Sequence, residues 1–259
     1  MSRSQARFAP RVDERPVALL TAMREELAPL LARVDLHERF DTGVCWAHRG
    51  ELRGAPVVLA HTGEGRTHAA ASATALFDCF RPRLAVVLGI SGGLSRALVP
   101  GRLVVARRVL DEDRPVAAPD TAWVERSLGH GNVVAGTVIS TRRILCTAAQ
   151  KAAAGSILGR DQPAVVDLES AVIAMAAARR GLPYLVLRSV CDTLEEELPL
   201  DLERCRDDSG GVRRLAVVGQ ALLHPSSVRG LWRLRRRLGR GARDLAETVE
   251  QLLDPGASS

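Results

Sequence analysis

Residues 84–93 read LAVVLGISGG, an apolar run that passes directly into a glycine-rich segment. The aliphatic and β-branched composition of 84–88 predicts a buried strand, and the glycines from Gly89 to Gly93 predict a loop after it. Comparable apolar runs alternate with longer helical patterns on both sides of this segment. This alternation predicts βαβ units and an α/β fold with a sheet that is at least partly parallel.

The other predicted elements follow from the same two patterns: short apolar runs predict strands, and longer helical patterns predict helices. We predict further strands at 17–21, 57–61, 103–109, 133–139, 165–168 and 184–190, and helices at 24–34, 67–80, 170–180, 212–224 and 228–253. The charged segment 111–130 contains two prolines and no periodic pattern, which predicts an excursion on the surface. The chain is expected to form one α/β domain with a helical C-terminal appendage.

The composition excludes several classes of protein. A chain of 259 residues with 46% hydrophobic residues has enough apolar side chains for a good-sized core, so disordered and collagen-like classes are excluded. The most apolar stretch, 171–187, is broken by two arginines and a proline, so no membrane span is predicted. The first 16 residues lack the apolar core of a secretory signal, and we expect a cytoplasmic location. The five cysteines form no Cys-x-x-Cys pair, which predicts free thiols.

The basic character of the chain is concentrated in one segment. Residues 229–243 contain seven arginines and no acidic residue, and without those arginines the formal net charge falls from +6 to −1. On a helix, one apolar stripe is formed by Leu231, Leu234, Leu238, Ala242 and Leu245. Such a helix could lie on an anionic membrane surface. The alternatives are a helix packed on the domain with solvated arginines, and nucleic-acid binding, for which only Trp232 could stack on bases.

Common catalytic motifs are incomplete in this chain. Gly63-Glu64-Gly65 follows a predicted strand, but His68 stands where a dinucleotide fingerprint needs its third glycine. The Gly-Lys-Ser/Thr of a phosphate-binding P-loop does not occur, and the six histidines lack metal-binding spacing, so no metal site is predicted. A serine hydrolase with Ser91 as nucleophile is a further alternative.

Three carboxylates follow predicted strands: Glu26, Glu169 and Asp192. Ligands of α/β sheets bind where strands end and loops begin, which makes these positions candidates for a site. Each also has a structural alternative, as a first-turn acid of a helix for Glu26 and Glu169 and as a helix cap or turn residue for Asp192. Asp192 follows the apolar run 185–191, and burial would let its carboxyl hold a proton near neutral pH.

Six segments taken in order resemble the nucleoside phosphorylase superfamily, which contains purine nucleoside phosphorylases and methylthioadenosine/S-adenosylhomocysteine nucleosidases. The segments are 20–26 (LTAMREE), 62–66 (TGEGR), 82–94 (PRLAVVLGISGGL), 100–105 (PGRLVV), 166–171 (VDLESA) and 188–192 (RSVCD). The resemblance covers about residues 16–195. It implies a three-layer αβα sandwich around a mixed, largely parallel, twisted sheet, with a catalytic domain over 16–210 and a helical extension over 211–253.

The resemblance also implies roles for the three carboxylates. Asp192 is similar to the family acid that hydrogen-bonds purine N7, and Glu169 to the carboxylate that binds the ribose hydroxyls. Glu26 stands where the nucleosidases place the base that activates water. Cleavage of the N9–C1′ bond produces a cationic sugar and a purine anion, so an acid at N7 and negative charge near the ribose both stabilise the transition state.

Further site residues are implied in the same way. Leu168 is similar to the apolar residue beside the sugar, and Ser91, Gly92 and Ile144 are expected to contact substrate. Arg66 and Gly65 are expected to hold phosphate if phosphate is a co-substrate; no other cofactor and no metal are expected. This chain has Ile90 where nucleosidases have serine and Leu168 where they have methionine. Hydrolysis and phosphorolysis both stay open, and Glu26 favours water.

The C-terminal segments 222–225 (LLHP) and 228–234 (VRGLWRL) resemble the hopanoid-associated phosphorylases. That resemblance implies adenosylhopane as substrate, adenine as product and a peripheral contact of 228–243 with the inner membrane face. A methylthioadenosine/S-adenosylhomocysteine nucleosidase or a purine nucleoside phosphorylase is the alternative within the class. A non-catalytic nucleoside-binding or membrane-surface module is the alternative outside it. The relatives imply a homodimer, and no nucleic-acid partner is expected.

Overall fold

The computed structural model describes residues 15–159, 162–206 and 227–254. Its strands are β1 (Val17–Thr21), β2 (Asp35–Asp41), β3 (Trp46–Leu52), β4 (Ala55–His61), β5 (Leu84–Gly93), β6 (Leu103–Asp111), β7 (Arg114–Pro115), β8 (Val133–Ser140), β9 (Ala164–Asp167) and β10 (Tyr184–Asp192). Its helices are α1 (Arg24–Leu31), α2 (Arg66–Phe80), α3 (Thr121–Leu128), α4 (Ala148–Gly155), α5 (Ser170–Ala178), the short 3₁₀ helix η2 (Leu202–Cys205) and α7 (Ser227–Leu253). The predicted helix 212–224 lies outside the described residues.

The sheet is mixed and curls upon itself. Its strands follow the order β10-β6-β8-β9-β5-β1-β4-β3-β2, and β10 also pairs with β5, so that five of the strands close into a ring. Strand β1 lies parallel to β4 and β5, and β10 lies parallel to β5. Strands β5 and β9 are antiparallel, as are β6 and β10. The α/β sandwich with a mixed sheet is confirmed.

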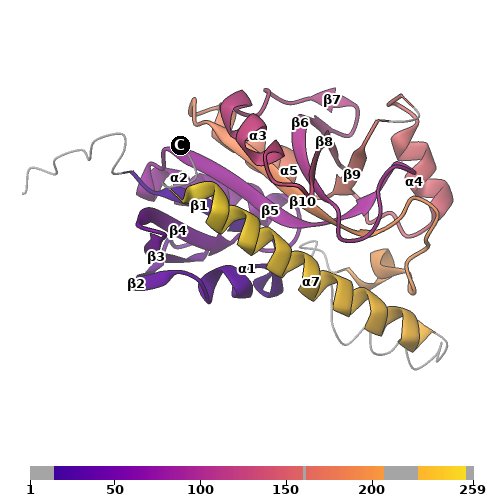
Figure 1. Ribbon diagram of the computed structural model, residues 1–259, viewed down its shortest axis with the longest axis horizontal. Helices are drawn as coiled ribbons and strands as arrows, with labels where there is room; N and C mark the ends of the chain where they lie inside the picture. Colours follow the sequence, from indigo (N-terminus) through magenta and orange to yellow (C-terminus); the bar gives the residue numbers. More distant parts are fainter. Residues whose placement is uncertain (1–14, 160–161, 207–226, 255–259) are drawn as a thin grey trace, which may run out of the picture.

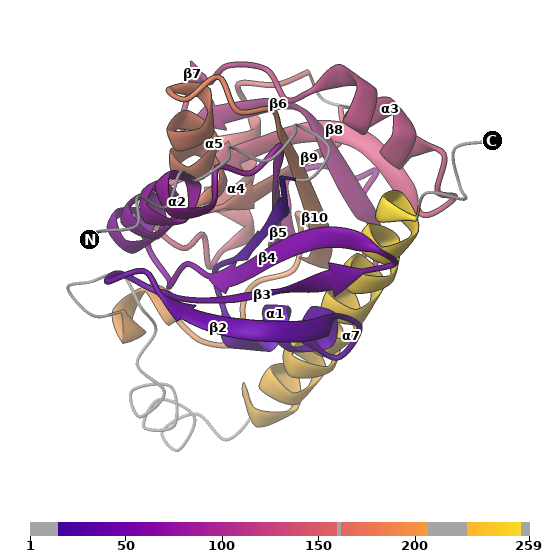
Figure 2. The same ribbon diagram turned by 90° about the vertical axis from the view of Figure 1, so that its left-hand side faces the viewer.

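Helices cover both faces of this sheet, because successive side chains of a strand point to opposite faces. In β1, Ala18 and Leu20 join the apolar cluster beneath α2 and α5, whereas Val17 and Leu19 join the cluster beneath α1, α3 and α7. Figure 1 shows α7 running across one face of the sheet with α1 beside it. Figure 2 shows α2 and α5 on the other side of the strands from α7. The C-terminal helix is therefore part of the layered domain.

The structure corrects the predicted loop at Gly89–Gly93. These residues continue β5, and Gly92 and Gly93 pair with Val166 and Val165 of β9. Glycine is needed here because other parts of the chain approach closely: a Cβ on Gly89 would lie 1.9 Å from Arg188 Nη1. A Cβ on Gly93 would lie 2.9 Å from the carbonyl oxygen of Asp192. The glycines thus serve close packing around β5 and form no turn.

Segment 111–130 is also more ordered than predicted. It contains β7 and the helix α3, whose first turn is capped by the Asp120 side chain accepting from the Trp123 N–H at 3.1 Å. Val124 and Ser127 are the buried residues of this helix. The hairpin β2–β3 and the helix α4 are further elements that the periodicity did not predict.

Candidate active site

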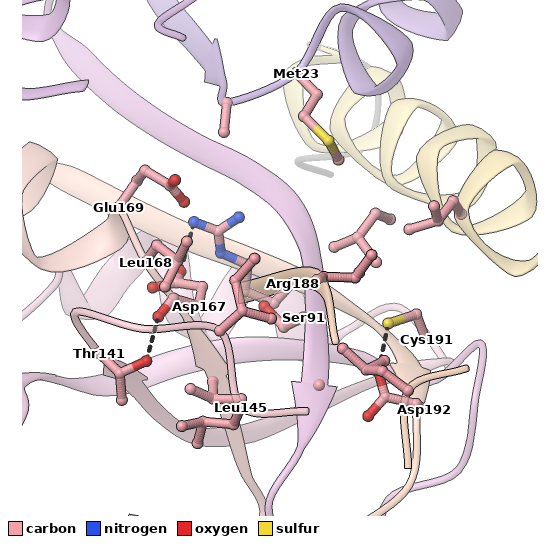
Figure 3. A pocket seen from close by; sticks show the side chains of 18 of the residues that line it. Met23, Ser91, Thr141, Leu145, Asp167, Leu168, Glu169, Arg188, Cys191 and Asp192 are labelled. Carbon is pink, nitrogen blue, oxygen red and sulfur yellow. Dashed lines mark hydrogen bonds and ion pairs between the residues drawn. The ribbon is translucent and has the colours of Figure 1, made fainter. Parts of the chain in front are cut away.

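The ends of six strands surround one cavity of about 240 Å³, which we call the central cavity. The walls include the segments after β1, β4, β8 and β9 and the last residues of β5 and β10. Seven of the residues predicted for the site line it: Glu26, Ser91, Gly92, Ile144, Leu168, Glu169 and Asp192. The three carboxylates, separated by up to 166 positions in sequence, therefore share one neighbourhood (Figure 3 shows two of them).

Glu26 occupies the third position of α1 and has two roles. Its Oε2 accepts from the Met23 N–H (3.1 Å), which caps the helix, and its Oε1 accepts from the Ile90 N–H of β5 (2.9 Å). Burial raises the pKa of its carboxyl, opposed by the charge of Arg188 and by the backbone hydrogen bonds. Burial therefore makes this carboxylate a stronger proton acceptor than an exposed one.

Glu169 lies just after β9 and is 6% exposed. Its Oε1 accepts from the Gly65 N–H at 2.9 Å, and the positive φ of 89° at Gly65 turns that N–H toward it. Burial first, and then the nearby charge of Asp167, raise the pKa of Glu169 to about 7. The carboxyl therefore changes its charge in the physiological pH range.

A buried ion pair supports this wall of the cavity. Arg188 of β10 lies 2.6 Å from Asp167 Oδ2, and both side chains are almost fully buried. Ser140 donates to Asp167 at 2.5 Å, and Arg188 donates to Ser170 Oγ at 2.7 Å. Figure 3 shows the guanidinium between Glu169 and Leu168 on one side and Ser91 on the other. Sequence reasoning gave Arg188 no role, although an arginine within an apolar strand was a usable signal.

Asp192 stands at the end of β10 with a partner that the sequence did not reveal. Lys151 of α4 is fully buried, and its Nζ contacts Asp192 Oδ1 in an ion pair. The Cys191 thiol donates to Asp192 Oδ2 at 2.9 Å. The sequence-based expectation for Asp192 considered burial alone, whereas the structure places the Lys151 amine directly against its carboxyl group.

The remaining predicted residues divide into two groups. Ser91, Gly92, Ile144 and Leu168 line the central cavity, and Ser91 Oγ is buried without a hydrogen-bond partner among the described residues. Ser91 lies within β5, so it lacks the sharp strand-to-helix turn of a serine-hydrolase nucleophile. Neither Arg66 nor Gly65 lines the cavity.

The contacts of Arg66 and Gly65 do not favour their predicted phosphate role. Arg66 Nη2 is paired with Asp111 Oδ1 at 2.7 Å, and the Gly65 N–H is taken by Glu169. Arg66 Nη1 is buried without a hydrogen-bond partner among the described residues. The described residues include no group of three histidine, cysteine or acidic side chains that could hold a metal.

Helix α7 closes one side of the site. Leu234 and Leu238 line the central cavity, while Ala242 and Leu245 are buried against the domain. Most of the predicted apolar stripe therefore faces protein, which matches the alternative of a helix packed on the domain. Arg237 fixes the helix through Glu196, with its two terminal nitrogens 2.8 and 3.1 Å from the two carboxylate oxygens. The cavity thus has an apolar wall that belongs to the C-terminal segment.

Comparisons with known proteins find relatives over most of the chain. Curated relatives include 5′-methylthioadenosine/S-adenosylhomocysteine nucleosidases of two bacteria. That of Exiguobacterium sp. is 29% identical over 72% of this chain and 89% of the relative. That of Geobacillus kaustophilus is 28% identical over 72% of this chain and 88% of the relative. Among solved structures, the nucleosidase of Neisseria meningitidis, in complex with methylthio-immucillin-A, has a TM-score of 0.73 at 19% identity over 93% of this chain and 99% of that one. Futalosine hydrolase of Helicobacter pylori has a TM-score of 0.72 at 18% identity, over 93% of this chain and 97% of that one.

The family comparison covers most of the chain. Residues 16–210 match the family described as the phosphorylase superfamily, and the resemblance inferred from the six ordered segments is confirmed. The expectation of an enzyme that acts on N-glycosidic bonds is confirmed as well. With the three predicted carboxylates around one cavity and residues 16–210 matched, this chain belongs to the phosphorylase superfamily.

Proposed function

We propose that this enzyme cleaves the N-glycosidic bond of an adenosine with an apolar 5′ substituent and releases adenine. The observation that carries the proposal is the shared position of Glu26, Glu169 and Asp192 around one cavity. The curated relatives named above are described as nucleosidases of methylthioadenosine and S-adenosylhomocysteine, both of which are adenosine derivatives, and this supports the same bond and base. Within this class, adenosylhopane is the substrate that we propose.

The three carboxylates divide the chemistry between them. Asp192 delivers a proton to purine N7 as the C1′–N9 bond breaks, so the base leaves without a full negative charge. Glu169 accepts hydrogen bonds from the ribose hydroxyls and places negative charge near the developing cation at C1′. Glu26 takes a proton from the attacking water. A general acid or base of this kind contributes roughly 10²–10⁴ in rate.

We propose water as the attacking molecule. The raised pKa of Glu26 makes it a suitable proton acceptor, and phosphate attack needs no such base. Arg66 is engaged by Asp111 and lies outside the cavity lining, so a cationic phosphate ligand is not provided at the predicted position.

The apolar wall of the cavity supports a large apolar 5′ group. Met23, Ile90, Leu198, Leu202, Leu234 and Leu238 line the cavity together with the charged groups. The last two of them come from α7, and Leu234 lies in the segment 228–234 whose sequence resembles the hopanoid-associated branch. A methylthioadenosine/S-adenosylhomocysteine nucleosidase is the second candidate, because the curated relatives have this description over 72% of the chain.

We further propose that the exposed N-terminal part of α7 contacts an anionic membrane. No helix in the described residues is both long and apolar enough to span a bilayer. Trp232 is 62% exposed and Val228 is 52% exposed, and the arginines at 229, 233, 235, 236 and 240 are exposed around them. An aromatic residue among arginines is suited to the membrane interface, where a lipid-tailed nucleoside would be presented.

Release of adenine tests the proposed reaction. The intact protein should liberate free adenine from a long-chain 5′-alkyl adenosine faster than from methylthioadenosine, and phosphate should not be required. The Asp192→Asn variant should lower the rate at least ~10²-fold. Glu51→Gln, which removes an exposed carboxylate on β3, is the matched control and should leave the rate unchanged. Equal rates for Asp192→Asn and the unmodified protein would exclude the acid role.

A further inference from the structure

The single lysine of this chain is one of its most deeply buried side chains. Lys151 lies on α4, is 0% exposed and extends to the end of β10. Its Nζ contacts Asp192 Oδ1 and donates to the carbonyl oxygens of Thr193 (2.9 Å) and Glu196 (2.7 Å). All other basic side chains that carry a permanent charge are arginines. A buried amine at this position requires an explanation beyond packing, because burying an ammonium group is costly.

The three contacts of Lys151 match the three N–H donors of an ammonium group. An ammonium group has three N–H donors and no acceptor, and here it faces one carboxylate oxygen and two carbonyl oxygens. A neutral amine has two donors and one acceptor, and it matches the same three oxygens only if Asp192 carries the proton and donates it to the amine. The Glu196 side chain does not compete for the ammonium, because Arg237 of α7 binds both of its carboxylate oxygens. Lys151 and Asp192 therefore hold one proton between them in this contact.

The same contacts fix the orientation of the Asp192 carboxyl. Oδ1 meets Lys151, and Oδ2 accepts from the Cys191 thiol. Burial and the charge of Asp192 raise the pKa of Cys191, so this thiol stays protonated and remains a donor. The Asp192 carboxyl also lies close to Gly92, because a Cβ added to Gly92 would be 3.2 Å from Asp192 Oδ1. Asp192 is thus held at the cavity edge by one charged and one neutral donor.

We propose that Lys151 is a positioning residue that orients Asp192 and replenishes the proton that Asp192 passes to the departing base. The proposal rests on the proposed function. Lys151 ammonium and Asp192 carboxylate together hold one transferable proton. That proton forms the N7–H bond while the C1′–N9 electron pair moves onto the purine, and water, deprotonated by Glu26, forms the new C1′–O bond. The pair then regains a proton from solvent as Glu26 releases one.

Substitutions at Lys151 separate charge from packing. Lys151→Met keeps nearly the same volume without the charge, and should lower kcat at least ~10²-fold with KM changed less than about threefold. Lys151→Ala should respond to added ethylamine or propylamine, whose ammonium group can enter the vacated space, with a recovery of kcat of at least ~10-fold. The same amines should not rescue Asp192→Asn. A role in packing alone predicts full activity for Lys151→Met and no effect of amines.

The single lysine also permits a test without any substrate. Incorporation of lysine labelled with ¹⁵N at Nζ gives one side-chain signal in the intact protein, which should be that of a protected ammonium at neutral pH. Asp192→Asn should shift this signal and speed its proton exchange. Asp201→Asn, an exposed carboxylate nearby in sequence, should leave it unchanged. A neutral-amine signal, or one insensitive to Asp192→Asn, would overturn the proposal even if the Lys151 variants fail to fold.

These experiments distinguish the two proposals from each other. If the unmodified protein releases adenine but Lys151→Met retains its kcat, the proposed function stands and the role of Lys151 is wrong. If no nucleoside is cleaved while the labelled signal behaves as expected, the ion pair exists but the function proposed for its site is wrong.

Discussion

At the scale of single residues, the buried carboxyl of Glu169 predicts an unusual dependence of stability on pH. Its pKa is raised from 4.5 to about 7 by burial and by Asp167. Between these two values the folded protein holds a proton that the unfolded chain releases. The contribution of this proton to the free energy of unfolding is complete below pH 4.5 and is lost as the pH rises to about 7. Its upper limit is about 3 kcal/mol.

The Glu169→Gln variant tests this prediction. A glutamine can still accept from the Gly65 N–H, but it does not titrate. Its free energy of unfolding in urea, relative to that of the unmodified protein, should increase between pH 4.5 and pH 7.5 and then level off. The exposed Glu51→Gln should follow the unmodified protein at each pH. A constant difference between Glu169→Gln and the unmodified protein would show that Glu169 has the same proton affinity folded and unfolded.

Sequence reasoning could find the acidic members of the site but not their partners. Glu26, Glu169 and Asp192 each follow an apolar strand, and the order of their motifs resembles a known superfamily. Lys151 is 41 positions from Asp192, on a short alanine-rich helix where the sequence predicts no element. The pairing depends on how α4 packs beside the end of β10, and local periodicity contains no information on that distance.

At the scale of elements, two glycines of α7 should respond oppositely to the same substitution. Gly239 has open space around it, so Gly239→Ala should stabilise the helix by up to ~1 kcal/mol. A Cβ on Gly241 would lie 2.5 Å from Ser189 Oγ and 2.9 Å from Ile90 Cδ1. Gly241→Ala should therefore destabilise the protein by about 1–3 kcal/mol and lower adenine release, because α7 forms part of the cavity wall. Urea unfolding of both variants measures the contrast, and a stabilised Gly241→Ala would show that α7 packs less closely than described.

The elements that periodicity predicted are those with two buried faces or one buried stripe. All five residues of β1 are buried, and β10 is buried along its whole length, so their apolar runs were clear. Strand β2 reads DLHERFD and is exposed along nearly all of its length, so it has neither an apolar run nor an alternating pattern. It is held by its ladder to β3, and hydrogen bonds of the backbone leave no signature in side-chain hydropathy.

At the scale of the whole molecule, α7 contributes both to the wall of the cavity and to the basic surface. The C-terminal half of this helix is packed against α1, β5 and β10, while its N-terminal half presents exposed arginines and Trp232. Arg236 lies over the Trp232 ring, 4.7 Å from its centroid. The helix that closes the cavity with Leu234 and Leu238 therefore also carries the basic surface of the protein. A membrane that bound this surface would lie close to the apolar wall of the site.

Vesicle binding by the intact protein tests this arrangement. The protein should co-sediment with vesicles containing an anionic phospholipid but not with vesicles of phosphatidylcholine alone, and binding should weaken as salt is raised. Arg235→Gln combined with Arg240→Gln removes two exposed cations of α7 and should weaken binding by about 2 kcal/mol, or ~30-fold. The pair Arg107→Gln and Arg108→Gln removes two exposed cations of β6 and should leave binding unchanged. Equal losses for the two pairs would indicate attraction by net charge alone, and the surface of α7 would then have no specific part in membrane contact.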